Sequence, residues 1–142
     1  GGGYIVLIQK ETQYHLAATA YDNQILSSMG LTGQPLVERG KRIIKRSYYE
    51  GIAGSEKRLC VYFRPSRQTR NGIFQEQVLQ VDCHVPADQD YMAYRIQKRV
   101  KELLHRYEFP GRVLFFSGML GELPSVSGFV CVGTRFTFYA GI

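Results

Sequence analysis

The sequence has no tryptophan, only three cysteines and no long apolar run. Its longest apolar segments, such as residues 4–8 and 113–116, are too short to cross a bilayer, and no secretory signal pattern opens the chain. The cysteines, Cys60, Cys83 and Cys131, form no CxxC pair and lie too far apart for a zinc knuckle. We therefore expect a soluble, non-secreted protein whose cysteines are reduced thiols packed in a core.

Motifs that would indicate an enzyme are also missing. The sequence contains neither GxGxxG nor GxxxxGK followed by Ser or Thr, and Phe115 stands where a GxSxG motif around Ser117 needs its first glycine. The carboxylates Glu102, Glu108 and Glu122 form no obvious acid–base pair. We expect no enzymatic activity, no metal and no cofactor.

Asp82, Cys83 and His84 are the one place where three potential metal ligands are adjacent. In a strand, alternation puts Asp82 and His84 on one face and Cys83 on the other, so the three cannot bind one ion without a break in the strand. A solvent-facing or interface pair is the simpler interpretation of Asp82 and His84. The alternative, a nuclease that uses these two residues with a divalent metal, stays open at this point.

Length and charge set wide limits on the rest. A chain of 142 residues suits a single domain, and we interpret glycines 1–3 as a tag scar or a trimmed end. A hydrophobic share of 44% and a charged share of 21% are typical of globular proteins and argue against disorder. The net charge of +6 permits contact with nucleic acid or with acidic protein surfaces, and charge alone does not choose between them.

Residues 88–107 have the clearest helical periodicity in the chain. Asp88 is a suitable N-cap for this helix. The apolar residues that recur on one of its faces are Ala93, Ile96, Val100, Leu103, Leu104 and Tyr107. One face of the helix must therefore be buried.

Four segments alternate between apolar and polar residues as strands do. They are residues 58–64, 75–85, 113–119 and 129–139. Pro65 and Pro86 are expected to end the first two. Because the long helix lies between the second and third segments, we predict an α/β (α+β) fold in β-β-α-β-β order. Its four-stranded antiparallel sheet carries the helix packed across it.

The N-terminal third is less regular. Helical spacing predicts a helix over residues 12–29, with Gly30 as its C-terminal stop. Residues 31–56 mix glycine, proline and charge, and we interpret them as a long connecting arm with one short strand around residues 43–49.

Basic residues gather in two connections. Arg64, Arg67 and Arg70 precede a predicted hairpin tip at Asn71-Gly72. A second cluster in the long connection consists of Lys41, Arg42, Lys45 and Arg46, followed by Tyr48 and Tyr49. Such residues can bind phosphates and stack on bases, or dock on an acidic neighbour. We favour an interaction arm, because no known nucleic-acid module such as the RNP1 pattern is present.

Four segments taken in order resemble the tail-terminator and neck (tail-to-head joining) proteins of phages. The segments are RLCVYFRPSR, VLQVDCHVP, YMAYRIQKRVKELLHRYEFPG and GELPSVSGFVCVGTRFTFY. The resemblance covers about residues 57–140 and rests on the order of strand, helix, hairpin and final aromatic strand. It includes no catalytic signature.

The resemblance implies a structural role in the virion. Such proteins form rings, expected here as a hexamer or dodecamer, at the head–tail interface after assembly in the host cytoplasm. Their implied partners are further copies of the same chain, the connector or stopper ring, the tail tube, and DNA that passes through the channel without sequence specificity. The runner-up functions are a basic nucleic-acid-binding module and a metal-dependent phage nuclease.

Overall fold

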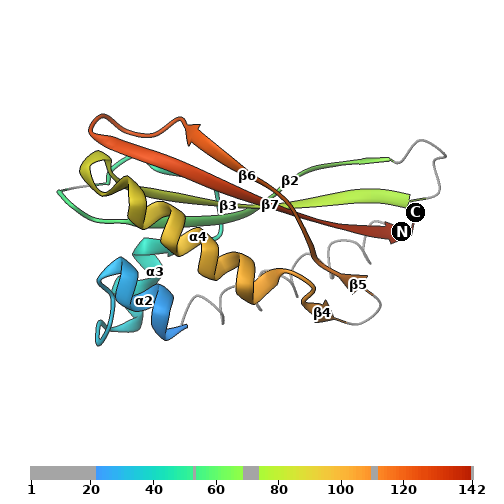
Figure 1. Cartoon of the computed structure of the whole chain (residues 1–142), viewed down its shortest axis with the longest axis horizontal. Helices are drawn as coiled ribbons and strands as arrows, with labels where there is room; N and C mark the ends of the chain where they lie inside the picture. The colour runs from blue at the N-terminus through green and yellow to red at the C-terminus, as the bar shows by residue number, and fades with distance from the viewer. Residues whose placement is uncertain (1–21, 53, 69–73, 110–111, 142) are drawn as a thin grey trace.

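The computed structural model of the chain describes residues 22–52, 54–68, 74–109 and 112–141. Within these residues the fold contains three α-helices and a five-stranded sheet (Figure 1). The prediction of a mixed α+β fold is therefore confirmed. None of the described helices is long and apolar enough to span a bilayer.

The sheet departs from the predicted four antiparallel strands. Its strands, in spatial order, are β1 (Ile43–Ile44), β2 (Arg58–Gln68), β3 (Phe74–Pro86), β7 (Phe129–Gly141) and β6 (Phe115–Leu123). Neighbours are antiparallel except that β1 runs parallel to β2. The strand expected over residues 43–49 is only two residues long, too short for alternation to define its bounds.

The predicted β-β-α-β-β order is also not matched exactly. A second, two-stranded sheet of β4 (Glu108–Phe109) and β5 (Arg112–Val113) stands between α4 (Asp90–Leu104) and β6. The connection of residues 31–56 is not a plain loop either, because it contains helix α3 (Leu36–Arg42) and strand β1.

Pro65 does not end the first long strand. β2 continues to Gln68, and its register with β3 shifts between Arg64 and Arg67, which marks a bulge at the proline. β1 pairs only with Leu59 and Cys60, so Pro65 lies where no described strand flanks the outer side of β2. A residue without an N–H is tolerated at such an edge bulge.

The long helix is shorter than predicted at both ends. α4 begins at Asp90, after a short 3-10 helix η1 (Ala87–Gln89) that contains Asp88, so Asp88 is not the N-cap. The N-cap is Gln89, and its side chain makes no capping hydrogen bond. The helix ends at Leu104 because its C-cap, His105, is extended with a ψ of 123°. Arg106 then takes a positive φ of 65°, ahead of β4.

Of the predicted helix over residues 12–29, the structure describes the part from Asp22 onwards, and residues 12–21 lie outside the described residues. Asp22 has an extended ψ of 132°, and its carboxylate accepts hydrogen bonds from the N–H groups of Gln24 and Ile25. It is thus the N-cap of helix α2 (Asn23–Met29). Gly30 ends α2 in the left-handed conformation, as predicted.

The core lies between the sheet and the helices. α4 lies across one face of the sheet and contacts β3 and β7 (Figure 1). Its buried apolar residues are Ala93, Ile96, Val100 and Leu104, and they meet Leu79, Val81, Val132 and Phe136 of the central strands. Leu103 is only partly buried. The predicted apolar face is therefore confirmed for the residues within α4, whereas Tyr107, which the prediction included, lies beyond the end of the helix.

Candidate functional site

Strand alternation gives the sheet a second, polar face. We call it the back face, because it lies opposite α4. The paired registers of β2, β3 and β7 align Tyr62 with Gln80 and Gln80 with Arg135 in one row. In the next rows Cys60 faces Asp82, and His84 faces Cys131. The back face therefore carries most of the charged and hydrogen-bonding side chains of the central sheet.

Gln80 is the centre of a hydrogen-bonded cluster on this face. Its amide oxygen accepts hydrogen bonds from Arg64 Nη1 at 2.9 Å and from Arg135 Nε at 3.1 Å. Its amide nitrogen donates to Asp82 Oδ1 at 2.7 Å. Gln80 itself is 2% exposed, whereas Arg64 is exposed and Arg135 is half-buried. Two guanidinium groups thus converge on one buried, neutral acceptor.

Asp82 holds the other end of the cluster. Its Oδ2 accepts a hydrogen bond from the Tyr62 hydroxyl at 2.7 Å. Burial raises the pKa of Tyr62 to about 12, with the hydrogen bond to Asp82 adding to the rise, so the hydroxyl stays protonated and donates. Gly133 lies opposite Asp82, and a Cβ there would come within 2.8 Å of Asp82 Oδ1. The carboxylate therefore occupies space that any side chain at Gly133 would need.

His84 is enclosed by three elements at the end of the back face. Its Nδ1 lies 2.8 Å from Ser125 Oγ in the β6–β7 turn, and its Nε2 lies 3.6 Å from Cys131 Sγ. The ring of Tyr49, from the long connection, stacks on it at 4.9 Å between centroids. Asp82 and His84 are both buried, at 6% and 1% exposure. The prediction that these two side chains face solvent is therefore wrong.

The Cys131–His84 contact is not an ion pair. Burial lowers the pKa of His84 to about 4, and burial raises the pKa of the Cys131 thiol. Both groups are therefore neutral near pH 7, whereas a nucleophilic cysteine needs a thiolate. All three cysteines are free and buried, as predicted.

The described residues also offer no metal site. No three His, Cys, Asp or Glu side chains among them are placed to hold an ion. Cys83 packs in the core on the α4 side, away from Asp82 and His84. Both residues of the alternative nuclease site are instead engaged by Tyr62, Gln80 and Ser125.

The predicted basic cluster of the long connection docks mainly on the chain itself. Lys41 pairs with Glu38 at 3.1 Å, and Arg42 donates to the carbonyl oxygens of Met29 and Lys57. The guanidinium of Arg46 lies 5.0 Å from the centroid of the Tyr48 ring. Lys45 also makes a contact within the chain.

Tyr48 in turn docks on β2. Its carbonyl oxygen accepts hydrogen bonds from Arg58 Nη1 at 3.1 Å and from Cys60 Sγ at 3.4 Å. Together with the stacking of Tyr49 on His84, this contact lays residues 48–49 against the end of the sheet. Part of the predicted arm is therefore a cover for the back face.

The second predicted cluster is only partly described. Arg64 lies on β2 and joins the Gln80 cluster, and Arg67 lies opposite Glu76 in the β2–β3 register. Arg70 and Asn71 lie outside the described residues. The sequence reasoning missed Gln80 and Arg135 as site residues. Gln80 lies between Leu79 and Val81, and this alternation is the one signal that could have found it, whereas Arg135 lies between Thr134 and Phe136 and gives a weaker signal.

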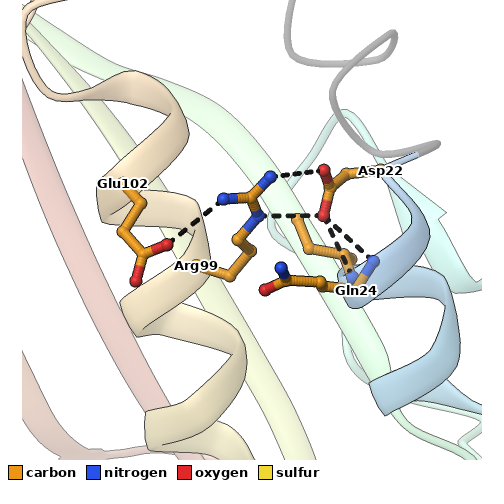
Figure 2. A network of polar contacts seen from close by, with 5 residues as sticks. Asp22, Gln24, Arg99 and Glu102 are labelled. Carbon is orange, nitrogen blue, oxygen red and sulfur yellow. Dashed lines mark hydrogen bonds and ion pairs between the residues drawn. The ribbon is translucent and has the colours of Figure 1, made fainter.

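A separate network on the opposite side of the molecule has a structural role. Arg99 of α4 donates to both carboxylate oxygens of Asp22, at 2.8 and 3.0 Å, and to Glu102 at 3.2 Å (Figure 2). The hydrogen bond from Arg99 lowers the pKa of Asp22. Because Asp22 also caps α2, this bidentate pair fixes α2 against α4.

His84 makes the stability of the fold depend on pH. Between its ordinary pKa of 6.5 and the lowered value of about 4, the unfolded chain binds a proton that the folded chain does not. We therefore expect the free energy of unfolding to decrease as pH falls through this window, compared with a His84→Gln variant. Urea titrations of both proteins across the window measure this difference. If the free energy of unfolding changes with pH equally in the two proteins, the pKa of His84 is not lowered in the folded state.

The comparisons with known proteins add no family: no protein-family model matches this sequence, and a search of curated proteins finds no significant match.

Proposed function

We propose that this chain is a structural phage protein that forms a ring at the head–tail junction or at the top of the tail. In this proposal it acts in the virion as a tail-terminator or tail-to-head joining protein, and the ring leaves a channel for DNA. The resemblance of residues 57–140 suggests the class. The geometry of the two sheet edges supports ring formation.

The observation that carries the proposal is that the two outer edges of the sheet expose different apolar side chains. At the β1 edge, α3 presents Leu36 and Val37, which are 66% and 68% exposed. At the β6 edge, Phe115 and Met119 are 45% and 39% exposed. A ring closes by contact between two different surfaces of each subunit, whereas a two-fold dimer uses one surface twice.

The directions of the edge strands are compatible with a contact between the β6 edge of one copy and the β2 edge of the next. β2, β3, β7 and β6 alternate in direction, so β6 of one copy runs antiparallel to β2 of a copy placed beside it in a ring. Beyond Cys60, no described strand pairs with the outer side of β2, and none pairs with the outer side of β6. Exposed strand edges of this kind are templates for pairing with another chain.

We expect the purified protein to form closed rings, and each edge to be necessary for them. Leu36→Glu with Val37→Glu blocks one edge, and Phe115→Glu with Met119→Glu blocks the other, because a charge in an apolar contact costs several kcal/mol. Each double variant should be monomeric in native mass spectrometry. Their equimolar mixture should form dimers and stop there, since only one intact interface remains.

Tyr91→Glu is the matched control for these variants. Tyr91 is 59% exposed and lies on α4, outside both α3 and β6, so this variant should still form rings. Circular dichroism checks that every variant folds. A monomeric wild-type protein, or edge variants that still close rings, would rule out the proposed contact.

A basic nucleic-acid-binding module is the second candidate function. The convergence of Arg64 and Arg135 on the back face favours it, since neither guanidinium is bonded to a carboxylate of the described residues. The nuclease alternative has no such support, because its two proposed ligands are buried in hydrogen bonds within the chain.

A further inference from the structure

We propose that Arg64 and Arg135, called here the arginine pair, bind phosphate oxygens of DNA on the back face of the sheet. If the chain forms the proposed ring, the arginine pair also identifies the back face as the surface that lines the DNA channel. This assignment to the channel rests on the proposed function.

No carboxylate bonded to the arginine pair balances its charge within the described residues. Arg64 and Arg135 share Gln80 Oε1, which is neutral, and no carboxylate of the described residues bonds to either guanidinium. By contrast, Arg99 is held by Asp22 and Glu102. Two neighbouring cations without a bonded carboxylate attract an external anion.

Hydrogen bonds to Gln80 hold both guanidinium groups of the arginine pair in place before any ligand binds. The Gln80 amide cannot turn freely, because its nitrogen donates to Asp82 Oδ1 while Asp82 Oδ2 accepts from Tyr62. Within the described residues each arginine uses one nitrogen in its bond to Gln80, which leaves further N–H groups of its guanidinium for a ligand. The planar guanidinium fork matches the spacing of phosphate oxygens.

The positive charges of the cluster are more exposed than its negative charge. Asp82, the only acidic member of the cluster, is 6% exposed and is bonded to Gln80 and Tyr62, whereas Arg64 is exposed. The outward charge of the cluster is therefore positive. Four exposed apolar residues that suit protein contacts lie at the sheet edges instead: Leu36 and Val37 on α3, and Phe115 and Met119 on β6. This distribution favours a phosphate backbone over the carboxylate of a protein neighbour.

The test measures how DNA binding depends on salt. Fluorescence anisotropy with a labelled short DNA duplex gives the slope of log K against log salt for the full chain. Each phosphate contact contributes about −0.9 to this slope, so the double variant Arg64→Gln, Arg135→Gln should flatten it by about 1.8. The matched control is Arg95→Gln, Lys98→Gln, which removes the same charge from exposed positions of α4 and should leave the slope unchanged.

A lysine pair separates lost charge from lost structure. Arg64→Lys, Arg135→Lys keeps both charges and should keep the slope, with weaker binding because the fork is lost. If the lysine variant loses the slope as the glutamine variant does, the loss reflects a damaged sheet and the proposal is wrong. It is equally wrong if the wild type does not bind DNA, or if the α4 control flattens the slope as much.

Native mass spectrometry of the same proteins keeps the two proposals apart. If the glutamine variant has a flatter salt slope than the wild type, but the wild type forms no rings, the DNA site stands and the proposed ring function fails. If the glutamine variant loses its rings while its salt slope is unchanged, the arginines bind a carboxylate of a neighbouring copy, and the DNA site is rejected.

Discussion

Replacing Gln97 by leucine is expected to lower the free energy of unfolding by about 2–4 kcal/mol. Gln97 is fully buried within the apolar face of α4. Its amide nitrogen donates to the carbonyl oxygens of Val81 at 2.8 Å and Val132 at 2.7 Å, and its oxygen accepts from the Thr134 hydroxyl at 2.9 Å. Leucine has a similar volume, but it removes all three hydrogen bonds and leaves the buried Thr134 hydroxyl without its partner.

Urea denaturation followed by circular dichroism measures the loss. Thr134→Val in the Gln97→Leu background serves as the control, because it removes the unpaired hydroxyl and should recover about 1 kcal/mol or more. A Gln97→Leu protein as stable as the wild type would mean that these hydrogen bonds contribute nothing net, and that α4 is held on the sheet by apolar packing alone.

Gln97 also shows what periodicity can and cannot predict. The apolar residues of α4 repeat at helical spacing, and this local signal was enough to place Ala93, Ile96 and Val100 against the sheet. Gln97 stands next to that stripe, and its polar side chain gives no sign that two strands far apart in sequence offer it acceptors. Those acceptors exist only because β3 and β7 are neighbours.

The candidate site depends on the same kind of long-range information. Alternation assigned Asp82 and His84 correctly to one face of a strand. It did not give the register that sets Gln80 opposite Arg135, nor the cover that Tyr49 and Ser125 place over His84. Facing is a local property of a strand, whereas register and burial depend on which segments pair and what packs over them.

The errors at element ends have local causes that the sequence signals do not resolve. Pro65 normally stops a strand, but an edge strand accommodates it by a bulge. Asp88 has the preferred chemistry of an N-cap, yet the chain forms a 3-10 turn first and begins α4 two residues later. In each case more than one backbone path suits the residue, and tertiary contacts select among them.

Leu104→Ala is expected to cost about 2–5 kcal/mol of stability, clearly more than Leu103→Ala. The sequence places both leucines on the apolar side of the helix, but the structure separates them: Leu104 is 1% exposed within the core, whereas Leu103 is only partly buried against it. Truncating Leu104 leaves a cavity near the end of α4, where the helix has just turned into the β4–β5 hairpin and has little freedom to collapse. Urea titrations of the two variants, which have the same composition, compare burial directly because the chemical change is identical. Equal losses of stability at the two positions would show that Leu103 and Leu104 are equally buried in solution. The position of the end of α4 on the sheet would then be wrong.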